Sequence, residues 1–234
     1  MTPFATLMLG LVLGLKHAFD SDHLIAVSTI VARERAPWRS LWIGLFWGIG
    51  HTLTLLTVGV LVLGMKTQIP PSLESSLECF VGVLLLGLGL MTLYDYWRKR
   101  VHTHTHSHEG ALHRHFHAHN EMLAHHHPHP IRLGLKPMLI GMVHGLAGSA
   151  ALMLLVLATI PSPTLGLLYI AIFGCGSVVG MGVVSLMMGV FFSLATDRLQ
   201  TLDQGIRLTV GGLSTAFGVW MIVEIGFVQG LFFV

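Results

Sequence analysis

The chain has 234 residues, of which 53% are hydrophobic and only 10% are charged. An ordinary soluble domain carries about 25% charged residues, so this deficit argues against a soluble protein and indicates that lipid is the solvent. The formal net charge of +2 argues against a basic nucleic-acid-binding surface. The two cysteines, Cys79 and Cys175, lie far apart in apolar segments, so we expect neither a disulfide nor a Cys-rich metal site.

Six apolar stretches are long enough to cross a bilayer, which takes about 20 residues of α-helix. We therefore predict an all-α integral membrane protein with six transmembrane helices. The spans are expected near residues 4–31, 41–64, 77–97, 137–160, 163–194 and 206–230. The N-terminal residues lack the basic region and cleavage site of a signal peptide, so we expect the first stretch to remain as a span.

Basic residues are distributed very unevenly between the loops. Eleven of the thirteen Lys and Arg residues lie after the first, third and fifth spans, whereas only Lys66 lies in a loop on the other side. By the positive-inside rule, these three loops are cytoplasmic. We therefore expect a multi-pass protein of a bacterial inner membrane with both termini outside.

The two halves of the sequence resemble each other. Gly14–Asp22 aligns with Gly141–Ser149 at an offset of 127 residues, and Trp47–His51 aligns with Phe173–Ser177 at an offset of 126. Each half holds three spans, so the second copy enters the membrane from the opposite side. Such a 3+3 inverted repeat is found in many secondary transporters, with the binding site near the midplane. The predicted units are a first repeat at 1–97, a cytoplasmic His-rich loop at 98–132 and a second repeat at 133–234.

The middle of the first span contains His17, Asp20, Asp22 and His23, next to Lys16. Two unpaired aspartates at a helix centre would cost about 5–7 kcal/mol, and a bound cation would offset that cost. On a regular helix, Asp22 and His23 point away from His17 and Asp20. Either the helix is locally unwound and all four converge on one ion, or one pair binds the ion and the other orients it. Lys16 is expected to pair with an aspartate when no ion is present.

Two further histidines, His51 and His144, lie near the middle of the second and fourth spans. A histidine in such a place can also be an interhelical hydrogen-bond donor, and this interpretation weighs more for His144 than for His51. Imidazoles with carboxylates suit borderline divalent ions such as nickel, cobalt and zinc. The candidate metal ligands are His17, Asp20, Asp22, His23, His51 and His144. We expect the ion to be cargo, with no permanently bound cofactor.

The segment His17–His23 matches the His-X4-Asp-His signature of the nickel/cobalt transporter family (NiCoT). Phe46–Thr52 is similar to the second motif of that family, and His144–Ala150 resembles its short UreH-like branch, which is associated with nickel enzymes such as urease. The resemblance implies secondary uptake of Ni²⁺ or Co²⁺, with the five polar residues of the first two motifs critical for transport. It also implies that the protein is not an enzyme.

No Gly-x-x-x-x-Gly-Lys-Ser/Thr motif occurs in the sequence, so we expect the membrane potential or a coupled ion to drive transport. A divalent ion gains about 4.6 kcal/mol on entry across 100 mV, which favours uptake. Efflux by proton exchange stays open, because related efflux proteins have a similar His-rich loop. An intramembrane zinc hydrolase and a haem-binding electron carrier are less favoured. The sequence lacks His-Glu-x-x-His, and carboxylates flank the histidines.

Residues 102–129 contain twelve of the sixteen histidines and few apolar residues. We expect this segment to lack regular structure without metal and to bind nickel, cobalt or zinc at neutral pH. It would act as a buffer, a sensor or a hand-off site to a cytoplasmic metallochaperone. The alternative is a tolerated polar linker.

We predict that deleting residues 102–129 leaves transport measurable but changes its dependence on metal concentration, because the segment lies outside the predicted spans. Metal uptake by cells that express the full-length or the deleted chain measures this. Complete loss of uptake by a correctly folded deletion variant would instead place the segment in the transport pathway.

Overall fold

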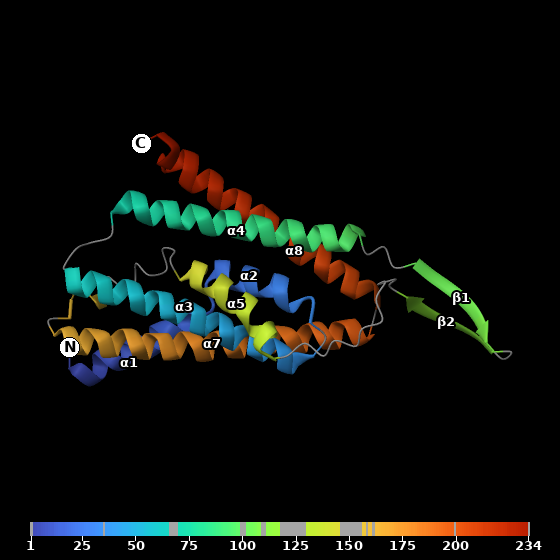
Figure 1. The fold of residues 1–234 in the computed structure, drawn as a ribbon, viewed down its shortest axis with the longest axis horizontal. Helices are drawn as coiled ribbons and strands as arrows, with labels where there is room; N and C mark the ends of the chain where they lie inside the picture. The colour runs from blue at the N-terminus through green and yellow to red at the C-terminus, as the bar shows by residue number, and fades with distance from the viewer. Residues whose placement is uncertain are drawn as a thin grey trace.

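The computed structural model describes residues 2–34, 36–65, 70–98, 102–108, 111–117, 130–145, 156–157, 159–160, 162–198 and 200–233. Nearly all of these residues are helical (Figure 1). The helices are α1 (Pro3–His17), α2 (Ser21–Val31), α3 (Pro37–Met65), α4 (Pro71–Arg98), α5 (Pro130–His144), α7 (Pro163–Arg198) and α8 (Gln200–Val223). A π-helical turn, η1 (Glu224–Val228), and a short 3₁₀ helix, η2 (Leu231–Phe233), follow α8.

Part of the His-rich segment forms two strands where the sequence predicted no regular structure. Strands β1 (His102–His108) and β2 (Ala111–His117) pair antiparallel, with His102 opposite His117. The β-branched residues Thr103 and Thr105 favour an extended backbone, a local preference that the composition of the segment does not reveal.

Four of the predicted spans are single helices that are long and apolar enough to cross a membrane: Pro37–Met65, Pro71–Arg98, Pro163–Ala195 and Gln204–Val228. The first predicted span is divided into two shorter apolar helices, α1 and α2. The fourth begins as α5, and residues 146–155 within it lie outside the described residues.

Besides a buried apolar core that includes Trp47 and Leu85, the described residues show many exposed apolar side chains and several buried polar ones. Large apolar residues on the long helices, among them Phe191, Leu194 and Trp220, are exposed, whereas His51 and His144 are fully buried. Lipid accommodates such an apolar exterior, so the structure is that of a multi-pass helical membrane protein.

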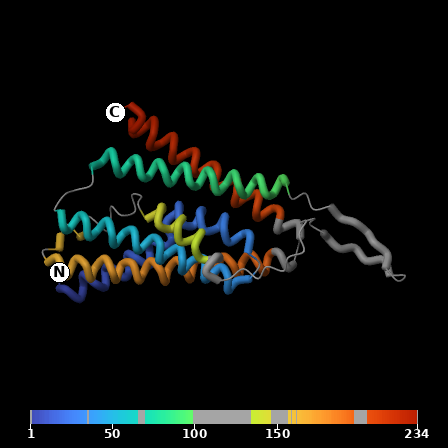
Figure 2. Tube along the Cα trace, in the orientation of Figure 1, coloured from blue at the N-terminus to red at the C-terminus, as the bar shows by residue number. Residues whose placement is uncertain are grey.

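The helices form two groups. In one group α3 packs along α7 and α5, and α1 packs along α7; in the other, α4 packs along α8. Helix α2 contacts helices of both groups and lies between them (Figure 1). The two ends of the chain lie at one end of the molecule (Figure 2).

The closest helix contacts are made at glycines, and they occur in related pairs. A Cβ atom on Gly14 would overlap the carbonyl of Phe173, and a Cβ atom on Gly141 would overlap the carbonyl of Trp47. Gly14 and Gly141 are equivalent at the offset of 127, and Trp47 and Phe173 at 126. The contact of Gly50 with Met138 is likewise equivalent to that of Gly176 with Leu11. At an offset of 129 residues, the contact of Gly89 with Thr215 is equivalent to that of Gly218 with Leu86. At these points each half of the chain contacts the other in the same way.

We predict that Gly141→Ala lowers the thermal stability of the protein, because the new methyl group meets the Trp47 backbone, which cannot rotate away. Overpacking of this kind costs about 1–3 kcal/mol. The measurement is thermal unfolding of the purified protein in detergent, followed by circular dichroism.

Gly87→Ala is the matched control, because nothing lies within 4 Å of a Cβ at that position on α4. This variant should be as stable as the wild type or slightly more stable, since alanine is the better helix former. Equal stability of Gly141→Ala and Gly87→Ala would contradict the close contact of α5 with α3.

Candidate metal centre

The first predicted span is interrupted at its polar residues. Helix α1 ends at His17, and α2 begins at Ser21 after a connection whose last residue, Asp20, has an extended backbone (φ −63°, ψ 144°). Aspartate commonly caps a helix N-terminus with its side chain, but Asp20 makes no such bond. The helix is therefore locally unwound here, as the first of the two expected arrangements requires, but Asp20 belongs to neither set of side chains that could hold one ion.

The carboxylate of Asp20 instead accepts a hydrogen bond from Nδ1 of His17 at 2.7 Å. A carboxylate on one imidazole nitrogen fixes the orientation of the ring and leaves the other nitrogen available as a ligand. That nitrogen, Nε2 of His17, lies 3.0 Å from Nε2 of His51 on α3. With metal–nitrogen bonds of about 2.0–2.1 Å, two nitrogens bound at a right angle to one ion lie about 3 Å apart.

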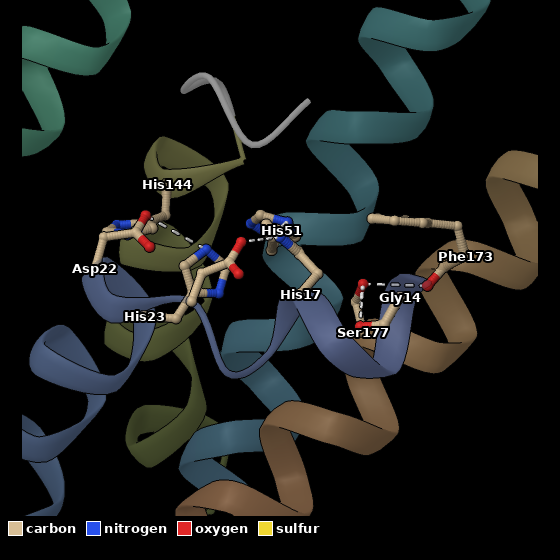
Figure 3. Close-up of polar contacts among 9 residues, drawn as sticks. Gly14, His17, Asp22, His23, His51, His144, Phe173 and Ser177 are labelled. Carbon is tan, nitrogen blue, oxygen red and sulfur yellow. Dashed lines mark hydrogen bonds and ion pairs between the residues drawn. The ribbon is translucent and has the colours of Figure 1, made fainter. Parts of the chain in front are cut away.

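A second imidazole–carboxylate pair lies on the other side of His23 (Figure 3). His144, the last residue of α5, places its Nε2 3.0 Å from Oδ2 of Asp22 on α2. The same carboxylate oxygen is 3.7 Å from Nε2 of His23, which is too long for a hydrogen bond.

His23 is therefore a buried imidazole between two imidazole–carboxylate pairs, each joined by a hydrogen bond. Its ring packs edge-on to those of His17, His51 and His144, with centroid distances of 4.5, 5.0 and 4.8 Å. Only 1% of the residue is exposed, and neither ring nitrogen has a hydrogen-bond partner among the described residues. Leaving a buried polar group unpaired costs about 1–3 kcal/mol, and a cation bound at the ring would remove this cost.

The polar side chains form two overlapping sets of candidate ligands. One set is His17, His23 and His51, and the other is Asp22, His23 and His144; within each set the ligand atoms lie within 4.8 Å of one another. Helices α1 and α5 both end at this cluster, and the partial negative charge of a helix C-terminus favours a nearby cation. The arrangement can hold a divalent ion through nitrogen and carboxylate ligands.

The six predicted ligands thus lie in one cluster, although the identity of those that bind metal stays a prediction. Asp20 is the most open of them, with 42% of its side chain exposed. Lys16 is exposed and forms no ion pair with Asp20 or Asp22, so the expected pairing is absent from this structure.

Three residues that the sequence did not single out for the site surround it. The ring of Trp47 lies 5.3 Å from that of His144, and the ring of Phe173 lies 5.6 Å from that of His17, measured between centroids. The hydroxyl of Ser177 donates to backbone carbonyls of α1 and α7. Ser177 is the repeat equivalent of His51, so at this position the second half contributes helix packing in place of a ligand. The internal repeat pointed to Trp47, Phe173 and Ser177, and Trp47 also lies within the second family motif, Phe46–Thr52.

The fold and the cluster define a class of protein, the multi-pass helical membrane proteins with buried imidazole and carboxylate groups. Comparison with known proteins narrows this class to a family. Residues 5–220 match the family described as the cytochrome c biogenesis protein transmembrane region. The chain is 40% identical over 231 residues to the urease accessory protein UreH of Bacillus sp. (strain TB-90), covering 97% of this chain and 94% of that protein. No solved structure matches the chain.

A shorter match joins the chain to a named transporter. It is 33% identical over 76 residues to the nickel transporter NicT of Mycobacterium tuberculosis (strain ATCC 25618 / H37Rv), or 31% of this chain and 20% of that protein. The chain therefore belongs to the family of the cytochrome c biogenesis protein transmembrane region and to the UreH-like branch of the nickel/cobalt transporters. Its relatives are named as an accessory protein and a transporter, and neither is named as an enzyme.

We predict that Asp20→Ala weakens Co²⁺ binding by about 10–100-fold, the usual effect of removing a group that orients a ligating histidine. Asp20→Asn should recover part of the affinity, because the amide oxygen can still accept from Nδ1 of His17. Titration of the purified chain with Co²⁺, followed by visible absorption, measures this. The twelve histidines of 102–129 are replaced by asparagine, so that only the cluster is observed.

Lys16→Ala in the same background is the control, because Lys16 is exposed and adjacent but is not paired with either aspartate. It should bind Co²⁺ as the background does. Unchanged affinity in Asp20→Ala would mean that the hydrogen bond to His17 has no role in metal binding.

Proposed function

We propose that this protein is a secondary permease that carries Ni²⁺, Co²⁺ or both into the cytoplasm, driven by the membrane potential. The observation that carries the proposal is the buried cluster at the break between α1 and α2. There, His23 has no hydrogen-bond partner in the described part of the chain, next to three other buried imidazoles and two carboxylates. The names of the relatives, a nickel transporter and a urease accessory protein, support nickel as cargo.

The donor set supports a borderline transition metal over a hard cation. Mg²⁺ and Ca²⁺ prefer oxygen ligands, whereas imidazole suits nickel, cobalt and zinc. The Nε2 atoms of His17 and His51, which are hydrogen-bonded at 3.0 Å, are already as close together as two ligands at a right angle on one ion would be. Tetragonal nitrogen and oxygen coordination is typical of Ni²⁺ and Cu²⁺.

The proposed architecture is six spans in a 3+3 inverted repeat, with units at 1–97, 98–132 and 133–234. The equivalent glycine contacts between the halves support this arrangement. The ends of α1 and α5 support it as well, because they fall at His17 and His144, which are equivalent at the offset of 127. Discontinuous helices at midplane are typical of ion sites in inverted-repeat transporters.

The proposed orientation has the His-rich loop in the cytoplasm and both termini outside a bacterial inner membrane. The distribution of Lys and Arg supports it. The loop would then receive the ion after its release and pass it to a cytoplasmic metallochaperone.

In the proposed cycle the ion exchanges water for imidazole and carboxylate ligands, the two halves change their relative orientation, and the ion is released inward. Across 100 mV a divalent ion gains about 4.6 kcal/mol on entry, which supports more than thousandfold accumulation. Efflux would have to overcome this free energy, for example by exchange with protons.

We predict that the chain in liposomes takes up Ni²⁺ when the interior is made negative with a K⁺ gradient and valinomycin, and that reversing the potential slows uptake. His51→Gln should reduce the rate to that of empty liposomes, because it removes a fully buried imidazole that faces His17. Cobalt uptake is measured in parallel.

Thr57→Ala, also on α3, is the matched control, because Thr57 bonds only to its own helix and is exposed; its rate should equal that of wild type. Orientation of the inserted protein is determined by protease access to the His-rich loop. Uptake that is indifferent to the potential would exclude the proposed driving force, and wild-type rates in His51→Gln would exclude this cluster as the pathway.

A further inference from the structure

The cluster contains two imidazole–carboxylate pairs whose histidines are equivalent in the internal repeat. Both carboxylates belong to the first half, and they bond different ring nitrogens, Nδ1 of His17 and Nε2 of His144. His17 at the end of α1 is held by Asp20 at 2.7 Å, and His144 at the end of α5 is held by Asp22 at 3.0 Å. His17 and His144 are the same position of the internal repeat, one in each half. Each pair thus presents one oriented imidazole to the centre of the cluster, from opposite halves of the chain.

His23 lies between the two pairs and contacts both in nearly the same way (Figure 3). Its ring centroid is 4.5 Å from that of His17 with an interplanar angle of 71°, and 4.8 Å from that of His144 with an angle of 76°. The repeat has Ala150 at the equivalent position, so the second half has no matching histidine. A single imidazole therefore faces two symmetry-related partners.

The two sets of candidate ligands share His23 and otherwise differ. The set with His17 and His51 consists of three imidazoles, all from the first half, whereas the set with His144 includes the carboxylate of Asp22 and a residue of the second half. Both nitrogens of His23 lack a hydrogen-bond partner within the described ranges. The ring is thus free to bind an ion through either nitrogen.

We propose that the cluster has two alternative positions for one metal ion, which share His23, and that the ion passes from one to the other during transport. This inference rests on the proposed function and adds a second binding position to it. In an inverted repeat, exchanging the conformations of the halves exchanges outward and inward access. Because His17 and His144 are equivalent, the same exchange moves the favoured position from one histidine to the other.

Sharing one ligand has a physical advantage. An ion that stays bound to His23 exchanges its other ligands stepwise and is never without protein ligands inside the membrane. Two adjacent positions of similar affinity also keep binding weak enough for the ion to leave.

Measuring Co²⁺ binding to four chains tests the proposal. The background chain has the twelve histidines of 102–129 replaced by asparagine, and the other three add His51→Ala, His144→Ala or both substitutions to it. Each single substitution removes a ligand of one position only. With two positions, at least one single variant should keep its affinity within about threefold of the background, because the other position still holds the ion. The double variant should lose at least about 100-fold, more than the product of the single effects.

The visible spectra of bound Co²⁺ supply a second measurement that needs no double variant. His51→Ala should favour the ligand set with a carboxylate and His144→Ala the imidazole set, so the two spectra should differ. Size-exclusion profiles in detergent verify that each variant is folded. The proposal would be overturned if both single variants had identical spectra and each lost tenfold or more in Co²⁺ affinity, and if the double variant lost the product of the two. That result would mean one joint site.

Measuring Ni²⁺ uptake alongside Co²⁺ binding distinguishes a failure of this inference from a failure of the proposed function on which it rests. Potential-driven Ni²⁺ uptake by the wild type together with single-site binding would leave the permease and reject the two positions. Two-position binding without any uptake would reject the permease and leave a metal-binding membrane protein.

Discussion

The structure depends on one constraint: imidazoles and carboxylates inside hydrocarbon must find partners, because water is not available to them. A regular first span would leave Asp22 and His23 facing away from His17, and each carboxylate would add several kcal/mol to the cost of insertion. Breaking the helix after His17 lets each aspartate pair with an imidazole, at 2.7 Å and 3.0 Å. Irregular backbone is tolerated at membrane depth where protein buries it or where it lines a water-filled cavity; in this connection Ala18 is 1% exposed, whereas Phe19 is 57% exposed.

Packing around the break follows from the same requirement. Helices α1, α3, α5 and α7 must approach closely to enclose the cluster, and glycines at their contacts permit this. Helix α2 carries Asp22 and His23 and extends toward the second group of helices. There, Arg33 pairs with Asp95 of α4 at 2.8 Å and donates to Thr92 at 3.0 Å. Two of the candidate ligands therefore lie on the helix that contacts both groups, so a change in the relative orientation of the groups would act on the site directly.

Much of this could be predicted from local sequence. The length of the apolar stretches gave four of the spans, and the spacing of His17, Asp20, Asp22 and His23 pointed to an unwound helix because no regular helix brings them together. The offset of 127 residues aligned His144 with His17 before any contact was known.

Other features arise from contacts between distant residues, which spacing does not encode. Asp22 pairs with His144 on α5, and not with its neighbour His23, because α5 reaches the cluster from the other half of the chain. Lys16 was expected beside an aspartate, but histidines occupy both carboxylates and the lysine is exposed. Strands β1 and β2 were missed because a count of histidines and apolar residues contains no information on backbone pairing.

The pairing of carboxylates with histidines also bears on how tightly the cluster can hold an ion. A free aspartate at low dielectric would attract a divalent cation strongly, and an ion bound in that way would leave slowly. In this structure both aspartates already accept hydrogen bonds from histidines, so part of their charge is compensated before an ion arrives. His23 has no such bond among the described residues, and its ring nitrogens are the candidate ligands at the centre of the cluster. A cluster arranged in this way favours moderate affinity with fixed geometry, which suits a site that an ion must both enter and leave.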